Sequence, residues 1–155
     1  MIITIPLQTI LDRIHTRSYY IGESYKAKDI DYSIVQSSID NVDELGVSID
    51  IALSNIAGML IKRVKDFTYD LEEDCIIDIT PYGREPENGD SVVKLLENAI
   101  IDYCVQYSVY HWLLVLKPEI ASPIGSLLPL IEDKIIKYIG MISNPVKRRY
   151  TAFGI

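Results

Sequence analysis

Two oppositely charged stretches carry most of the sequence's potential for chemistry. The first runs from Asp66 to Asp90 and contains nine carboxylates but one cation, Arg84, so it holds more than the whole net charge of -7. The second is the C-terminal peptide NPVKRRYTAFGI, residues 144–155, in which three consecutive cations accompany two aromatic residues. Opposite charges placed far apart on one chain favour electrostatic recognition between molecules. The sequence therefore indicates binding before it indicates catalysis.

The acidic stretch is predicted to form a β-hairpin near residues 67–80. Apolar and polar residues alternate on both sides of the turn candidate EED, which is typical of two strands with one buried face. The stretch lacks the alternating ligands and central glycine of an EF-hand loop, so we expect a solvated or subunit-facing surface and no metal. The residues expected on this surface are Asp70, Glu72, Glu73, Asp74 and Asp78.

The basic peptide is predicted to be a docking arm. Burying Tyr150 and Phe153 would contribute about 1.5–3 kcal/mol each, whereas ordering each arm residue costs about 1–2 kcal/mol in backbone entropy. Two anchors do not offset residues 145–155, so the arm needs a partner, and the acidic hairpin of an adjacent copy is one candidate. An ordinary frayed basic tail is the alternative. The docking residues are Pro145, Lys147, Arg148, Arg149, Tyr150 and Phe153.

Catalytic signatures are largely missing. The peptide GESYK at 22–26 lacks the second glycine of a nucleophile elbow, and the sequence contains no GxxxxGK phosphate loop. His15 and His111 have no second ligand at zinc spacing. Cys75 and Cys104 lie in apolar surroundings without CxxC spacing, which predicts buried, reduced thiols. We therefore expect no enzyme activity, no cofactor and no metal site.

The longest apolar tract, from Ala99 to Leu116, is predicted to be a buried helix. It contains Asp102, Gln106 and His111, which disfavours a membrane span, and no membrane partner is expected. Asp102 and His111 are nine positions apart, so we expect each to find a different partner.

Bulk composition fits one soluble domain. The 155 residues are 48% hydrophobic and 24% charged, and the N-terminus shows no signal peptide. The reduced thiols expected at Cys75 and Cys104 suit a cytosolic product. The negative net charge argues against general or sequence-specific nucleic acid binding, because counterion release requires a cationic surface.

Apolar periodicity predicts helices over 6–21, 41–66 and 91–116, with Asp90 or Ser91 as the N-cap of the last. The 41–66 helix runs through Gly46 and Gly58, which could mark close helix approach; two helices broken at Gly46 are the alternative. A final amphipathic helix ends at Asn144 and carries a possible kink at Pro129. Ile2, Ile3 and Ile5 suggest a short strand, while the secondary structure of the run YSIVQ stays undecided.

The predicted fold class is thus mainly α. It is a bundle of about four helices spanning 1–144, with an acidic β-hairpin insertion and an extended C-terminal arm, 145–155.

Two short patterns accompany this order of elements. One is YxVYxWL in the apolar helix, formed by Tyr107, Val109, Tyr110, Trp112 and Leu113, and the other is PxKRR in the terminal tail. Together with the element order, they resemble small head-tail connector proteins of tailed phages and prophages of gut Bacteroidales. The chain departs from that family in its prolines at positions 118, 123 and 129, where a smooth helix is expected.

The resemblance implies a structural virion protein of the neck. Such a protein forms a homo-oligomeric ring, commonly of twelve copies, beneath the portal protein and joins capsid to tail around the DNA path, after assembly in the host bacterial cytoplasm. The residues that match the family's docking tail are Pro145, Lys147, Arg148 and Arg149. A tail-completion or tail-terminator protein, and a small regulatory binding module, are the alternatives.

Overall fold

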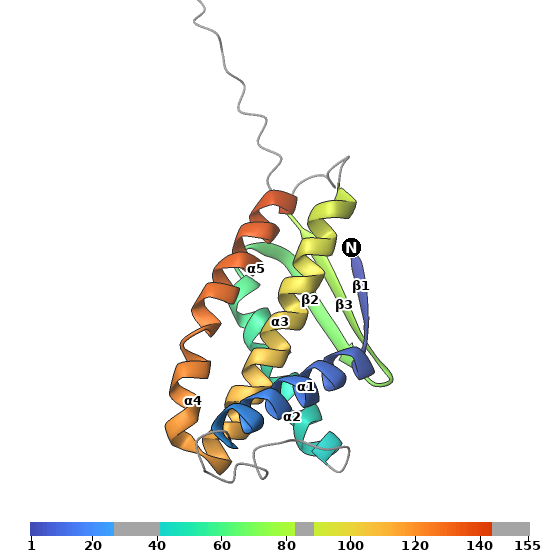
Figure 1. Cartoon of the computed structure of the whole chain (residues 1–155). Helices are drawn as coiled ribbons and strands as arrows, with labels where there is room; N and C mark the ends of the chain where they lie inside the picture. Colours follow the sequence, from blue (N-terminus) through green and yellow to red (C-terminus); the bar gives the residue numbers. More distant parts are fainter. Residues whose placement is uncertain (27–40, 83–88, 144–155) are drawn as a thin grey trace, which may run out of the picture.

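The computed structural model describes residues 1–26, 41–82 and 89–143. In this part of the chain a layer of helices packs against one face of a three-stranded antiparallel sheet, as Figure 1 shows. The mainly helical class is confirmed, although the helices number five. In chain order the elements are β1 (Ile2–Pro6), α1 (Leu7–Lys26), α2 (Val42–Leu60), β2 (Val64–Leu71), β3 (Asp74–Pro81), α3 (Gly89–Leu116), α4 (Pro118–Gly125) and α5 (Leu128–Ser143).

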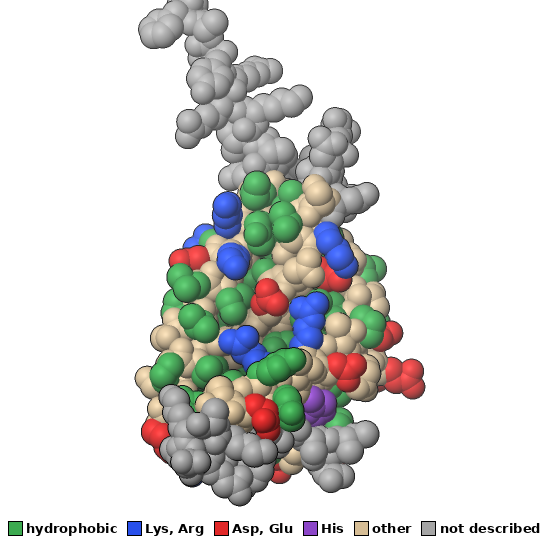
Figure 2. All heavy atoms as spheres, viewed as in Figure 1, with side chains coloured by type: hydrophobic (Ala, Val, Ile, Leu, Met, Phe, Trp, Pro, Cys, Tyr) green, Lys and Arg blue, Asp and Glu red, His purple; other side chains and the backbone are tan. Residues whose placement is uncertain are grey.

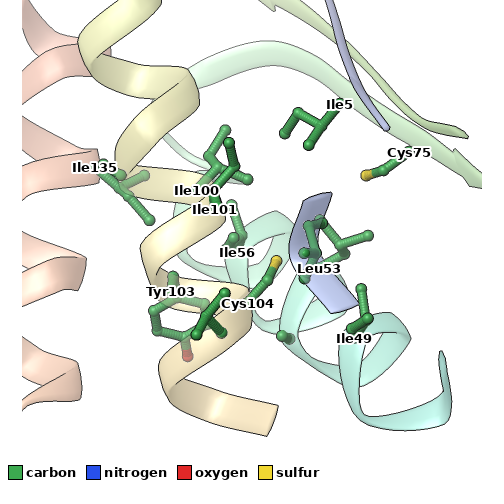
Figure 3. Close-up of a cluster of buried hydrophobic side chains, with 14 of the residues drawn as sticks. Ile5, Ile49, Leu53, Ile56, Cys75, Ile100, Ile101, Tyr103, Cys104 and Ile135 are labelled. Atoms are coloured by element: carbon green, nitrogen blue, oxygen red, sulfur yellow. The ribbon is translucent and has the colours of Figure 1, made fainter. Parts of the chain in front are cut away.

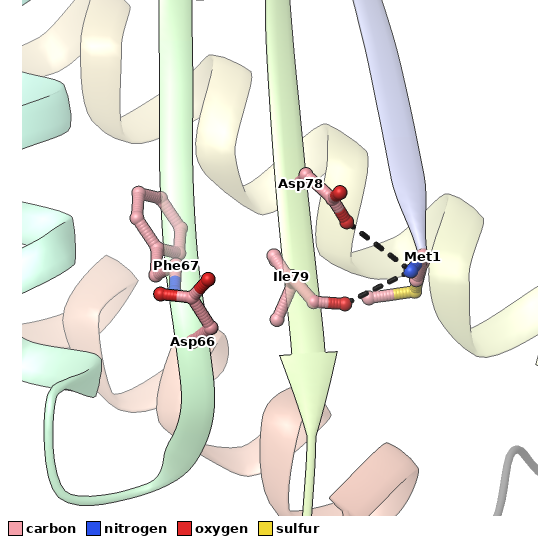
Figure 4. Close-up of polar contacts among 5 residues, drawn as sticks. All are labelled: Met1, Asp66, Phe67, Asp78 and Ile79. Atoms are coloured by element: carbon pink, nitrogen blue, oxygen red, sulfur yellow. Dashed lines mark hydrogen bonds and ion pairs between the residues drawn. The ribbon is translucent and has the colours of Figure 1, made fainter.

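The predicted hairpin is present, and the N-terminal strand extends it. The sheet order is β1-β3-β2, with both pairs antiparallel, so β3 is central. The N-terminal amino group of Met1 donates to the carbonyl oxygen of Ile79 at 2.9 Å and lies 3.4 Å from Oδ1 of Asp78 (Figure 4). The hairpin is therefore part of a sheet that closes one side of the core.

Residues alternate between the two faces of this sheet, as a strand period of two requires. One face is buried against the helices, whereas Ile2 and Ile76 on the other face remain 67% and 43% exposed. The sheet therefore has one apolar face and one face open to solvent. The buried face of β1 and β3 consists of Ile3, Ile5, Cys75, Ile77 and Ile79.

Helix α3 occupies the centre of the helical layer and contacts each of the other four helices. Between residues 99 and 109 only Asp102 is exposed, so nearly the whole circumference of the helix is covered. Figure 3 shows Ile100 and Cys104 of α3 facing Leu53 and Ile56 of α2, with Ile5 and Cys75 of the sheet nearby. Gln106, which is also buried, donates from Nε2 to the carbonyl oxygen of Ile124 at 2.6 Å and so ties α3 to α4.

Helix α2 runs through both glycines, as predicted. An alanine Cβ at Gly46 or Gly58 would meet nothing within 4 Å, so the expectation of close helix approach there is wrong. The predicted end at residue 66 is also wrong: the helix stops at Leu60, because Val64 already begins β2. Its buried side chains repeat every three or four positions, as one face of a helix requires, and include Leu45, Ile49, Leu53, Ile56 and Leu60.

Two other predicted boundaries are corrected. Helix α1 begins after Pro6, which pairs with Asp74 as the last residue of β1, and it continues to Lys26 instead of ending at residue 21. Helix α3 begins at Gly89, so neither Asp90 nor Ser91 is its N-cap. The strand pairing of β1 overrides the preference of proline for a first helical turn.

The C-terminal region forms two helices where one was predicted. Pro118 is the first residue of α4, and Pro129 lies in the first turn of α5, where its missing N–H has no helical acceptor to lose. The expected kink at Pro129 is therefore absent. Gly125 lets α4 end close to α3, because a Cβ there would lie 2.7 Å from Cε2 of Tyr110.

One-sided burial of the sheet predicts unequal effects at two adjacent positions. Ile77→Ala removes a fully buried side chain and is expected to lower the free energy of unfolding by about 2–5 kcal/mol. Ile76→Ala, on the open face, is the matched control and is expected to cost less than about 1 kcal/mol. Urea denaturation measures both, and equal losses would contradict the assignment of the two faces.

Candidate functional site

The five predicted surface carboxylates lie together on the hairpin, and we refer to them as the acidic hairpin surface. Asp70 pairs with Ile76 and Thr68 pairs with Asp78 in the β2–β3 register, so both aspartates lie on the open face of the sheet. Glu72 and Glu73 form the turn, and Asp74 follows at the start of β3. All five side chains are exposed, and four of them can meet a partner without prior rearrangement, whereas Asp78 is paired with the N-terminal amino group of Met1.

Charge on the hairpin is polarised along its length. Exposed cations, Lys62 and Arg63 in the α2–β2 turn and Lys65 at the start of β2, lie at the opposite end of β2 from Glu72 and Glu73. Eight strand residues separate the two ends, at about 3.3 Å each. The negative potential is therefore concentrated at the β2–β3 turn, and a cationic partner would be steered to that end.

The residues of the predicted docking arm, Pro145, Lys147, Arg148, Arg149, Tyr150 and Phe153, lie outside the described residues. The undecided run YSIVQ lies outside them as well. The arm stays a prediction from sequence.

A groove that sequence reasoning missed lies between α1 and the α4–α5 region, with α3 as its floor. It consists of two adjoining hollows of about 580 Å³ and 330 Å³, which share Arg17, Asp102 and Val105 in their linings. Figure 2 shows Lys and Arg side chains interspersed with hydrophobic ones on this side of the molecule. We call it the α1–α5 groove; its other lining residues include Arg13, Tyr20, Ile21, Leu127, Leu130, Ile131 and Lys134.

Two cations of the groove carry uncompensated charge. Arg13 lies 3.5 Å from Asp102, and Asp12 accepts a hydrogen bond from Nε2 of Gln8 at 2.6 Å. By contrast, Arg17 and Lys134 make no ion pair within the described residues, and Nε of Arg17 is buried there without a hydrogen-bond acceptor. A buried unpaired donor is costly, so an acceptor entering the groove would be bound favourably at this atom.

The sequence contained a weak signal for this groove. Arg13 and Arg17 are four positions apart and therefore share one face of α1. Nothing in the sequence, however, indicates that Lys134 of α5 approaches the same place across α3.

A third hollow, of about 590 Å³, contains a serine–histidine contact. Ser48 Oγ lies 2.9 Å from Nδ1 of His111, whose ring stacks on Tyr107 at 6.1 Å. Ser48 is only 3% exposed and also hydrogen-bonds the carbonyl oxygen of Glu44. Among the described residues nothing hydrogen-bonds the other ring nitrogen of His111, so no third group orients the ring as in a catalytic triad. The contact joins α2 to α3, and His111 and Asp102 have separate partners, as expected.

The two cysteines are buried and unpaired, as predicted. Burial raises the pKa of the Cys75 thiol to about 11 and raises the pKa of Cys104 as well. Thiolate is the reactive form of cysteine, so neither side chain is poised as a nucleophile near neutral pH. Across the three described segments no group of three or more potential metal ligands is close enough to hold an ion.

Comparison with known proteins identifies no relative: no family model, curated protein or solved structure matches the chain. In the described part of the chain, no helix has both the length and the apolar character required to cross a membrane. The function is therefore inferred from the fold and the charged surfaces.

Burial of the thiols predicts a loss of stability in alkali. The folded-state pKa of Cys75, about 11, lies above its ordinary value of 9.0, so above pH 9 the unfolded chain releases this proton more readily. The free energy of unfolding is expected to fall as pH rises from about 9 to 11. Urea denaturation across this range measures the fall.

The matched variant is Cys75→Ala, in which the fall should be shallower, because Cys104 and Tyr103, whose pKa burial raises to about 12, still contribute. An identical pH dependence in the variant would contradict the assignment.

Proposed function

We propose that this protein is a structural subunit of a phage head-tail connector, which forms a ring around the DNA path between portal and tail. The observation that carries the proposal is the segregation of exposed charge. The acidic hairpin surface lies on the β2–β3 hairpin, with most of its charge at the turn, whereas Arg17 and Lys134 lie in a groove bounded by α1 and α5. Complementary patches at different places on one chain favour head-to-tail association, which generates a ring when the rotation closes.

The acidic face of the sheet suits a passage for DNA. Exposed carboxylates on this face such as Asp66 and Asp78 repel phosphates. A lumen with this face inward would let DNA slide without binding it. The helices around α3 would then form the rigid body of each subunit, a bundle closed on one side by the sheet.

The C-terminal arm is the proposed link to the portal or to a neighbouring subunit. Its three cations and two aromatic residues are suited to an acidic, partly apolar surface of a partner. The element order and the YxVYxWL and PxKRR patterns, which resemble connector proteins, support the same placement in the virion neck.

The proposal predicts a symmetrical assembly of the full chain. We expect mass photometry of the purified protein, alone or with its portal, to show a species of many subunits, and electron microscopy to show rotational symmetry. A chain that ends at Asn144 is expected to assemble or dock less well, because the arm's contacts are lost.

Two variants of unchanged length separate the arm's contributions. Lys147→Ser/Arg148→Ser/Arg149→Ser removes the charge, and Tyr150→Ser/Phe153→Ser removes the aromatic anchors. A full chain that stays monomeric both alone and with a portal would overturn the connector assignment. Equal assembly and equal portal binding after truncation would remove the arm from the mechanism.

A further inference from the structure

We infer that the hairpin tip of one copy inserts into the α1–α5 groove of a second copy. The hairpin tip comprises Asp70, Glu72, Glu73 and Asp74. This inference rests on the proposed ring assembly and names the two surfaces that make its subunit contact.

The tip is shaped and charged for insertion. The β2–β3 turn projects past the start of α1, beyond the body of the molecule (Figure 1). The turn is tight: the backbone N–H of Glu72 donates to the carbonyl oxygen of Asp74 at 3.3 Å, and Leu71 pairs with Cys75. All four carboxylates are exposed, and none has an ion-pair partner within the described residues. The tip therefore presents carboxylate acceptors without ion-pair partners at the end of a narrow hairpin.

The groove offers the complementary features. Within the described residues Arg17 and Lys134 supply two unpaired positive charges on α1 and α5, which exceed the one unpaired negative charge of the lining, that of Asp12, and Nε of Arg17 needs an acceptor. The nearby rims are apolar and exposed, with Tyr20 at 67% and Leu130 at 61% exposed, so contact there would also cover hydrophobic surface. The exposed pair between Arg13 and Asp102 can exchange partners at little cost.

The tip does not fill the groove of its own chain. The linings of both hollows come from α1, α3, α5 and the α4–α5 turn, and no hairpin residue is among them. The tip lies near the start of α1, whereas the groove is lined by the later part of that helix, from Asp12 to Ser24. The contact must therefore be intermolecular, and each copy carries both halves of it.

A second copy fits this groove better than nucleic acid does. Two free cations give only a small counterion-release term, and the chain as a whole would repel phosphates. The hairpin tip of a second copy instead presents several carboxylates, most of them on consecutive residues.

Charge reversal on each side tests the contact in the full chain. The tip variant is Glu72→Lys/Glu73→Lys, and the groove variant is Arg17→Glu/Lys134→Glu. Each variant alone is expected to weaken self-association by about tenfold or more, because the substituted side chains at the end of the turn or in the groove then face like charges and the attraction between tip and groove is lost. An equimolar mixture should recover assembly, since in an alternating ring the lysines at positions 72 and 73 meet the glutamates at positions 17 and 134, and the unchanged tip meets the unchanged groove.

Controls separate charge pairing from net charge and from misfolding. Asp43→Lys/Asp66→Lys makes the same change in net charge as the tip variant, at exposed positions outside both surfaces, and should leave association near the wild-type level. Thermal unfolding checks that each variant is folded. If a carboxylate near the buried Nε unfolds the chain, Arg17→Ala/Lys134→Ala replaces the groove variant as a test of weakened association, and the single reversal Lys134→Glu replaces it in the rescue mixture.

Mass photometry and analytical ultracentrifugation give distinguishable outcomes. Rescue in the mixture, with the control unaffected, supports the inference. If the wild type assembles and both reversed variants assemble equally well, the tip–groove contact is wrong, while the connector function stands. Weakened variants that fail to rescue each other also overturn the pairing. A wild type that remains monomeric alone and with a portal overturns both proposals.

Discussion

The need to cover α3 on all sides governs this structure. Its middle, from 99 to 109, exposes only Asp102, so the helix is stable in water only when other elements surround it. Helices α1, α2, α4 and α5 all contact α3, while β1, an edge strand of the sheet, reaches it from the remaining side. One buried polar side chain on α3 serves this purpose as well: Gln106 donates a hydrogen bond to the carbonyl oxygen of Ile124.

Covering α3 also determines where charge can be placed. The sheet needs only one face for this task, so its other face is free to carry Asp70 and Asp78 in place of apolar side chains. The amphipathic helices α1 and α5 likewise contact α3 along one face and leave cations at their margins, where Arg17 and Lys134 line the groove. Separation of the two charged surfaces is therefore a consequence of how the core is built.

The sequence predicted the parts of this fold whose signal is local. Alternation identified β2 and β3, and helical periodicity identified α2 through both of its glycines, because each pattern is read within one element. Boundaries failed where tertiary pairing decided them: Pro6 belongs to β1 because it pairs with Asp74, and α2 stops at Leu60 because Val64 joins the sheet. The acidic residues were located because they are contiguous. The groove was not, since Arg17 and Lys134 come together only through the packing of α1 and α5 on α3.

Weak individual contacts are compatible with a stable ring. An exposed ion pair contributes only about 0.2–1 kcal/mol, so one tip in one groove would hold two copies loosely. In a closed ring every subunit makes this contact twice, once through its tip and once through its groove. Breaking one contact therefore releases no subunit, because the two subunits beside the break remain bound to their other neighbours. Linked contacts of this kind raise the effective concentration of each tip near its groove. Isolated pairs would then dissociate and correct wrong registers, while the completed ring persists, and high salt would weaken assembly by screening the exposed charges.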